Sequence, residues 1–368
     1  MAGRAPSLPA RYLLRVQYDG TNFHGFQRQA KARTVQGCVE DALSRFVGGE
    51  KKGDDDATDA TDATDATDTA RRSGVLTHGS SRTDAGVHAL DATMHVDLTR
   101  VSRVRSPSLT PNPFEARAVM SATNHFLRRA GANDARVWAC ARVCPEKFHA
   151  RYSATARTYV YRLRVSPAHR PPSVFEKGKV WHVVRDEPLN VDAMREAARH
   201  LTGARDFSSF RARGCQAKSA ARTVDALDVE VDDALANAFD PEHRAWFGER
   251  DTDFSGLPEE VLEREETRRE ETNGGSGVKK KKTKNFVSCV AITARAPSFL
   301  YHQVRLMVAT LVAVGAGDMT PADVQELLAK KDVSFAPPMA PACGLYLARV
   351  HYDGSRKWDA RRGAASDG

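Results

Sequence analysis

Apolar residues recur along this chain with both strand-like and helix-like spacings. Residues 12–18 predict a strand that ends at the turn Asp19-Gly20. After it, seven apolar residues recur at helical spacing and form one face: Val35, Cys38, Val39, Ala42, Leu43, Phe46 and Val47. Thr34 is a candidate N-cap of this helix, and Gly48-Gly49 a candidate end. The chain therefore opens with a strand and a helix.

The same two periods continue through the rest of the chain. Residues 92–98 alternate between apolar and polar side chains, which predicts a half-buried strand. Further strands are predicted at 158–165, 223–232, 286–295 and 345–352. Helices are predicted at 112–129, opening with a capping box at Asn112 and Glu115, at 191–201, at 298–314 and from Thr320-Pro321 onward. Strand–helix–strand order in both parts predicts an α+β protein of two similar sheet-and-helix halves with a cleft between them.

Two segments interrupt this pattern. Residues 54–70 repeat Thr, Asp and Ala, and residues 238–285 mix charged residues with glycines and a lysine run. Both are predicted to be disordered insertions. The first has no large apolar residue with which to offset its ordering entropy, and the middle of the second is a candidate transient charged helix. The lysine run is more typical of a solvated linker than of an RNA-binding segment or a nuclear address. Without the insertions, we expect an N-terminal half at 11–145, a C-terminal half at 146–353 and a tail at 354–368.

Composition narrows the class of protein. The 368 residues carry a net charge of +8 and are 41% hydrophobic. A basic balance suits a polyanionic partner, because neutralising phosphates releases counterions. No apolar run approaches the roughly 20 residues of a membrane helix, and the N-terminus has no secretory pattern. The six cysteines include no C-x-x-C pair, so we expect reduced thiols, no metal and an intracellular protein, with nucleus, cytoplasm and organelle left open.

Candidate chemistry is concentrated in the nine residues from Ser81 to Ala89, which read SRTDAGVHA. Asp84 lies two residues after Arg82 in a predicted loop. A carboxylate beside a guanidinium stays ionised, and an ionised Asp can act as nucleophile or base while the Arg holds a phosphate. Taken alone, the residues are more typical of a surface turn.

The whole nine-residue string resembles the signature of the TruA family of tRNA pseudouridine synthases, in which the Asp of R-T-D-A-G is catalytic. The resemblance makes Asp84 the catalytic residue and implies that Arg82 fills the space of an extruded base or holds its phosphate. It also implies the TruA-type fold, in which two halves flank a central basic cleft. Ser81 stands where bacterial members have Gly, so the chain resembles the eukaryotic TruA-like branch.

Other segments resemble the family in the expected order. Residues 18–29 resemble its Y-D-G…G-x-Q-x-Q opening, which implies RNA contacts by Gln27 and Arg28, although the same pattern also fits a loop with its aromatic residues in the core. Residues 148–161 resemble F-H-A-R…A-R-x-Y-x-Y. In that block Tyr159 matches the active-site Tyr that stacks on the target base and is a candidate proton acceptor, Arg157 is a candidate substrate contact, and Tyr161 is predicted in the core.

Three C-terminal segments complete the resemblance. Residues 206–211 resemble D-F-x-S-F, whose role we expect to be structural. Residues 298–307 resemble F-x-x-x-x-V-R, which implies that Arg305 pairs with Asp84; the alternative is an Arg that faces solvent. Residues 344–347 resemble G-L-x-L, which implies that Leu345 lines the pocket under the base.

The resemblance implies an enzyme that isomerises uridine to pseudouridine without cofactor or metal. The implied substrate is structured RNA, in the first place the anticodon stem-loop region of tRNA, and the implied assembly is a homodimer. One alternative is a catalytically silent RNA-binding protein or tRNA chaperone with the same fold. A second is a hydrolase that uses Asp84 with His88, for which Asp91 is the only other acid near the motif.

Overall fold

The computed structural model describes residues 8–48, 75–101, 112–231 and 287–352. Within them, nine strands form one sheet with the order β4-β1-β3-β11-β5-β10-β9, while β2 pairs with β3 and β6 with β5. The strands are β1 (Ala10–Tyr18), β2 (Thr77–Gly79), β3 (His88–Leu98), β4 (Ala135–Val143), β5 (Ala156–Ser166), β6 (Trp181–Val184), β9 (Ala226–Val231), β10 (Ser288–Ala296) and β11 (Leu345–His351). A separate hairpin joins β7 (Gly203–Asp206) and β8 (Ala221–Val224).

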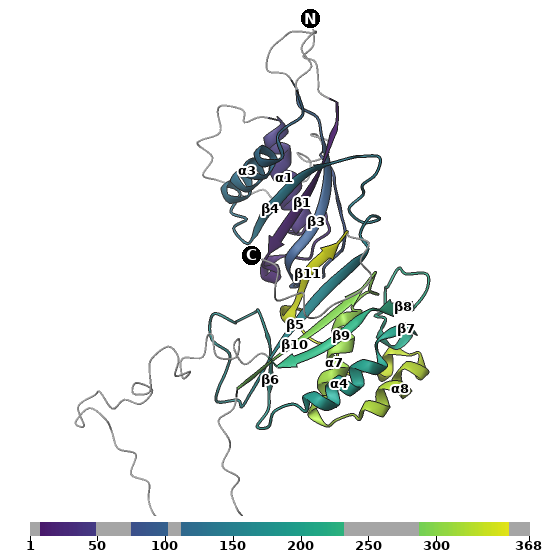
Figure 1. Cartoon of the computed structure of the whole chain (residues 1–368). Helices are drawn as coiled ribbons and strands as arrows, with labels where there is room; N and C mark the ends of the chain where they lie inside the picture. The colour runs from purple at the N-terminus through teal and green to yellow at the C-terminus, as the bar shows by residue number, and fades with distance from the viewer. Residues whose placement is uncertain (1–7, 49–74, 102–111, 232–286, 353–368) are drawn as a thin grey trace, which may run out of the picture.

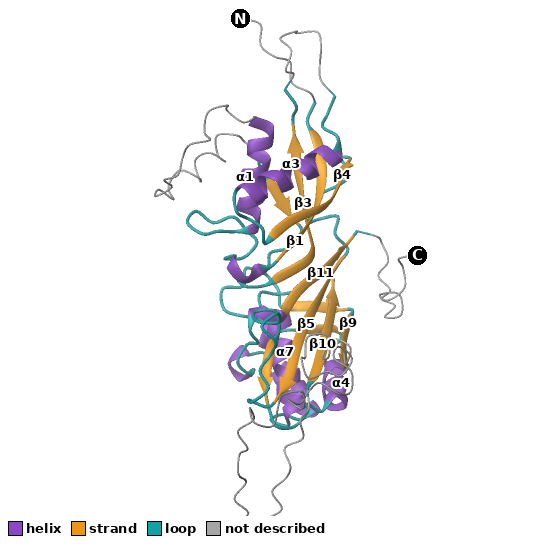
Figure 2. Cartoon of the chain, turned by 90° about the vertical axis from the view of Figure 1, so that its left-hand side faces the viewer, coloured by secondary structure: helices purple, strands orange, loops and turns teal. Residues whose placement is uncertain are grey.

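Helices cover each half of this sheet (Figure 1). The N-terminal half carries α1 (Val35–Gly48) and α3 (Ala116–Arg129), and the C-terminal half carries α4 (Val191–His200), α7 (Gln303–Ala316) and α8 (Pro321–Lys330). Each half has a buried apolar core of its own, one centred on β1, β3 and α1 and the other on β5, β10, α4 and α7. The expected α+β protein with two sheet-and-helix halves is confirmed, and Figure 2 shows that it is elongated along the line joining them.

Strand β11 joins the two halves. It pairs in parallel with β3, placing Tyr346 opposite His88, and antiparallel with β5, placing Leu345 opposite Tyr161. The last strand along the described chain therefore lies near the middle of the sheet (Figure 1). Because the sheet runs through both halves, a division between residues 145 and 146 stays a prediction.

Two predicted helix starts are wrong. Helix α7 begins at Gln303 rather than Ser298, because His302 adopts a left-handed backbone with φ 62°, which no α-helix continues through. Helix α3 begins at Ala116, with Glu115 at its N-cap and no side-chain capping bond, so the predicted capping box at Asn112 is absent. The caps at Thr34 and Thr320 are present, since each side chain accepts a backbone N–H three residues on.

Two strand predictions also need correction. Strand β3 is buried on both faces rather than one, because residues 148–152 and Tyr352 cover its polar side. There the amide of Ala150 donates to His95 Nδ1, and Thr93 shares a hydrogen bond with the Tyr352 hydroxyl. The single strand predicted from Thr223 is broken at Asp225, where the chain leaves the β7–β8 hairpin and enters the main sheet.

Several expectations lie outside the described residues: the insertions 54–70 and 238–285, the lysine run and the tail 354–368. Among the helices that the structure describes, none has the length and apolar character to cross a membrane.

Candidate functional site

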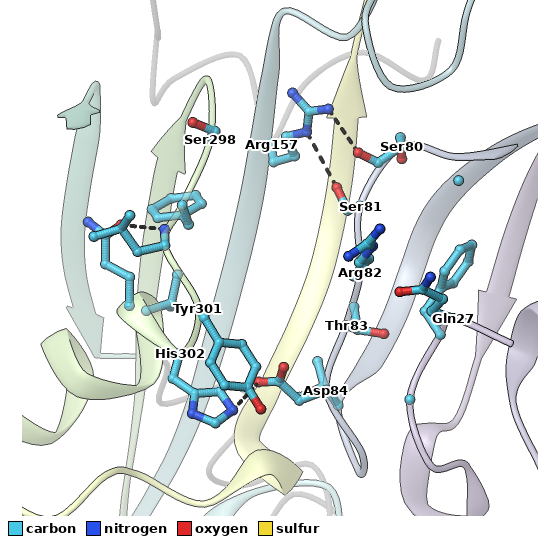
Figure 3. A pocket seen from close by; sticks show the side chains of 18 of the residues that line it. Gln27, Ser80, Ser81, Arg82, Thr83, Asp84, Arg157, Ser298, Tyr301 and His302 are labelled. Carbon is cyan, nitrogen blue, oxygen red and sulfur yellow. Dashed lines mark hydrogen bonds and ion pairs between the residues drawn. The ribbon is translucent and has the colours of Figure 1, made fainter. Parts of the chain in front are cut away.

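A cleft of ≈ 1420 Å³ opens where the two halves meet. Its walls come from residues 24–29 and 77–87 of one half and from residues 149–159, 213–222 and 298–305 of the other. Among the described residues that line it are six arginines and a single carboxylate, Asp84. The predicted central basic cleft is thus present, with the candidate catalytic residue in its wall (Figure 3).

The loop that carries Asp84 is held by the opening segment of the chain. The Phe26 amide donates to the Thr83 carbonyl over 3.1 Å, and the Tyr18 hydroxyl and Thr83 Oγ1 lie 2.7 Å apart. Gly25 has φ +99°, and a Cβ atom there would lie 2.9 Å from the Thr83 carbonyl oxygen, so only glycine allows this approach. The alternative reading of residues 18–29 is confirmed in part, since Phe23 and Phe26 are buried in the core.

Two side chains at the start of α7, His302 and Arg305, contact the Asp84 carboxylate. Asp84 Oδ2 lies 3.2 Å from His302 Nε2 and 3.5 Å from Arg305 Nη1. The expected pair of Arg305 with Asp84 is therefore present, and Arg305 Nε also donates to the Ala340 carbonyl over 2.8 Å. The Asp84 side chain keeps 21% exposure, so it is accessible to a substrate in the cleft.

His302 was missed by the sequence analysis. Its ring stacks on Tyr301 at 3.7 Å between centroids, and its left-handed backbone turns the imidazole toward Asp84 (Figure 3). A left-handed non-glycine residue costs free energy and persists where the surroundings impose it, which is common at functional sites. The available signal was its position three residues before Arg305, which places both residues on the same side of a helix start.

Tyr159 lies on β5 in the wall of the same cleft, and Leu345 lines the cleft from β11. Burial raises the pKa of Tyr159 to about 12, although the positive charge of Arg157 acts in the opposite direction. The Tyr159 ring meets the edge of Phe299 at 5.4 Å. Tyr161, two residues on, is fully buried and donates its hydroxyl to the Pro341 carbonyl, as expected of a core residue.

The four other candidate contacts have different surroundings. Arg82 and Gln27 line the cleft. Arg157 also lines it, but its N–H groups donate to the Ser81 hydroxyl and to the carbonyl oxygens of Ser80, Arg151, Ala154 and Pro297. Burial lowers the pKa of Arg157. The Arg157 side chain therefore links the Asp84 loop to residues 151–154 through hydrogen bonds. Arg28 does not line the cleft; it pairs with Glu40 and Asp41 on α1.

Among the described residues that line the cleft, no second carboxylate accompanies Asp84 for hydrolysis. Asp91 pairs with Arg15 instead. His88 is buried, with Nδ1 accepting the Gly20 amide and Nε2 3.0 Å from the Gly178 carbonyl. Within the described parts of the chain, no group of three or more His, Cys, Asp or Glu residues has an arrangement that could hold a metal ion.

Comparison with known proteins adds an independent result. Residues 197–353 match the sequence model of a family described as tRNA pseudouridine synthase. A protein of Cereibacter sphaeroides named tRNA pseudouridine synthase A is 34% identical over 342 residues, which cover 93% of this chain and 97% of that protein. Proteins of the same name from Methylobacterium nodulans, 35% identical, and Paramagnetospirillum magneticum, 32% identical, match 93% and 94% of this chain and 96% of their own length.

Proposed function

The chain belongs to the tRNA pseudouridine synthase A family and is an enzyme that isomerises uridine in tRNA, and we propose that Asp84 is its catalytic carboxylate. The observation that carries the proposal is the setting of this side chain. It is the one carboxylate among the described residues of an arginine-lined cleft, and His302 and Arg305 both contact one of its oxygens. The branch of the family stays a prediction.

The geometry suits a reaction in which one bond is exchanged for another within a closed site. The N1–C1′ bond of the uridine breaks, the uracil rotates, a C5–C1′ bond forms, and the C5 proton is lost while N1 gains one. Both contacts to Asp84 fall on Oδ2, so Oδ1 is the oxygen that faces the substrate, as nucleophile or as proton acceptor. The contacts from His302 and Arg305 fix the orientation of the carboxylate.

The remaining residues of the cleft serve the flipped nucleotide. Extruding a base costs a few kcal/mol, which a stacking partner and polar contacts offset. Tyr159 and Leu345 supply apolar contact to the uracil, and Arg82 contacts the backbone phosphate or fills the vacated stack. We assign Gln27 to the RNA as well, and Arg157 to holding the loop in place. The arginines that line the cleft can neutralise phosphates of the RNA.

We further propose that the target lies in the anticodon stem-loop region and that two copies of the chain hold one tRNA. The family resemblance supports both. A cleft of ≈ 1420 Å³ takes an extruded nucleotide and its neighbours, so the rest of a tRNA needs further surface. Light scattering of the purified protein at micromolar concentration tests the dimer, and a monomeric mass would overturn it. The free cysteines are in keeping with an intracellular location.

Tritium release from tRNA transcripts labelled at uridine C5 tests the proposed role of Asp84. The intact protein should release tritium, and Asp84→Asn should release it at least about 100-fold more slowly, because a positioned proton-transfer group contributes that much or more. Asp84→Asn should still bind the tRNA, and Asp91→Asn serves as the matched control outside the cleft. Equal rates for Asp84→Asn and intact protein would reject this role.

The same assay separates the alternatives. Binding without tritium release across a panel of tRNAs would favour a silent RNA-binding protein or tRNA chaperone. Free uracil in the reaction would favour hydrolysis, against which the engagement of Asp91 by Arg15 already argues.

A further inference from the structure

A ladder of aromatic rings lies in the cleft wall formed by residues 77–79 and 149–152, and the reaction does not use it. It consists of His78, His95, His149 and Tyr152, called here the ring ladder. His95 is buried at its base, 4.9 Å from His78 and 4.6 Å from His149 between ring centroids. Tyr152 lies 4.4 Å from His149 with the rings tilted by 33°.

The outer ring of the ladder is unusually exposed for a tyrosine packed on other rings. Tyr152 exposes 78% of its surface, yet it lines the cleft together with His78 and His149. Core packing explains His95, which is 1% exposed, but it does not explain Tyr152. An aromatic face that is held by other rings and open to an RNA-binding cleft is a stacking surface for a base.

The turn that carries Tyr152 is fixed before any ligand arrives. The amides of Arg151 and Tyr152 both point at His149 Nδ1, over 3.1 and 3.4 Å. The Ser153 amide donates to the His149 carbonyl over 2.9 Å, and the His149 amide contacts Ser153 Oγ at 3.0 Å. A preorganised ring loses little conformational entropy when a base stacks on it.

The charge around the ladder suits a nucleotide rather than an apolar peptide. Arg151 follows His149 and lines the cleft. Burial, together with the positive charges of Arg11 and Arg151, lowers the pKa of His149 below its ordinary 6.5, so its ring is neutral at physiological pH and stacks without a charge of its own. A neutral aromatic face beside a guanidinium matches a flat base attached to a phosphate.

The ladder is also tied to the Asp84 loop. The Arg157 guanidinium donates both to the Ser80 carbonyl in that loop and to the Arg151 carbonyl beside Tyr152. Ser80 is four residues from Asp84, a separation that spans at most about 14 Å even when extended. A nucleotide close to the target in the RNA chain is therefore within reach of the ladder.

We propose that Tyr152, backed by the ring ladder, binds an unpaired base of the tRNA that neighbours the target uridine. This inference rests on the proposed function for the identity of the RNA. It adds a second base-binding position beside the one that Tyr159 and Leu345 form. The ladder sets which loop conformations fit the cleft, because a base that is paired or stacked within the RNA cannot also stack on Tyr152.

The test measures binding of unmodified tRNA transcripts that carry one abasic nucleotide at each anticodon-loop position in turn. Tyr152→Ala should weaken binding of the intact transcript by roughly 5- to 150-fold, the range expected for loss of one stacked base. Tyr152→Phe and Tyr152→Trp keep an aromatic face and should bind within about threefold of the intact protein. Phe175→Ala is the matched control, because Phe175 is 71% exposed and does not line the cleft.

The abasic series separates stacking from damage to the fold. One abasic position should weaken binding to the intact protein and have almost no further effect on Tyr152→Ala, which is the signature of two coupled groups. If every abasic position weakens both proteins equally, the proposal is wrong, even if Tyr152→Ala binds poorly. Binding is measured without catalysis. Absence of tritium release would therefore reject the proposed function, while the abasic binding series would still decide whether Tyr152 stacks on a base.

Discussion

At the scale of single residues, the site depends on one backbone conformation that helical periodicity cannot reveal. His302 has φ 62°, which delays the start of α7 to Gln303 and brings its imidazole to 3.2 Å from Asp84. The pairing of Arg305 with Asp84 could be predicted from motif resemblance, because the segment that carries Arg305 follows the other motifs in the order expected of the family. The contact of His302 with Asp84 could not be assigned in this way. Its position three residues before Arg305 was a hint, but a left-handed residue leaves no apolar pattern in the sequence. Arg157 and Arg28 were predicted to contact RNA, but the fold gives them other partners. Arg157 donates to backbone carbonyls and Arg28 pairs with acids on α1.

His302→Asn tests whether the imidazole orients the catalytic carboxylate. Asn tolerates the left-handed conformation, so the backbone at the start of α7 should keep its shape. We expect kcat to fall roughly 10- to 100-fold with KM within about threefold, because a misplaced catalytic group costs that much. Steady-state tritium release gives both constants.

His302→Gly provides the control for strain. It also accepts φ 62° and removes the ring, so its kcat should match that of His302→Asn. Full activity in either variant would show that Arg305 alone orients Asp84.

At the scale of elements, strand β3 differs most from its expected form. Alternation in residues 92–98 predicted one solvated face, but the segment around Ala150 and Tyr352 covers that face. Period two correctly gave a strand, because the pleat fixes which side chains share a face. It could not predict that the polar face of β3 is covered, because the covering residues lie more than fifty positions away in the sequence. The buried histidine His95 is the result.

The buried position of His95 predicts a pH dependence of stability. Burial, with the nearby positive charge of Arg11, lowers the pKa of His95 to about 4 from an ordinary 6.5. Between these values the unfolded chain binds more protons than the folded chain. Stability is therefore complete above about pH 6.5 and falls as the pH drops toward 4. Urea unfolding at several pH values measures the slope.

His95→Gln separates this residue from the other titrating groups. Glutamine does not titrate, and its side-chain oxygen is an acceptor for the Ala150 amide that His95 now binds. The free energy of unfolding of the variant should depend less on pH between 4 and 6.5. An unchanged slope would assign the acid sensitivity to other groups.

At the scale of the whole molecule, charge is distributed unevenly over the surface. The net charge of +8 predicted a polyanionic partner, but it could not predict where on the protein that partner binds. Among the described residues that line the cleft, six arginines surround a single acid at the junction of the halves. The sequence could not show this, because the arginines come from segments up to about two hundred residues apart and meet only through the shared sheet.

Arg213→Ala should weaken tRNA binding most at low salt. Arg213 is exposed in the cleft wall, so we expect it to contact a phosphate. The slope of log Kd against log salt should become shallower by about 1. Arg142→Ala removes the same charge from an exposed position on β4 outside the cleft and should leave the slope unchanged. Identical slopes for all three proteins would place the phosphates elsewhere.

The central place of β11 has a consequence for how the protein is made. A ribosome completes β3 and β5 long before residues 345–351 emerge, so for most of synthesis each half exposes an open strand edge toward the other. Open edges pair readily with other chains, so the nascent chain is most exposed to aggregation before β11 is made. A message cut short before residue 345 therefore yields two unjoined halves without a working cleft. The two walls of the cleft are thus joined through β11 only after residue 351 has been translated.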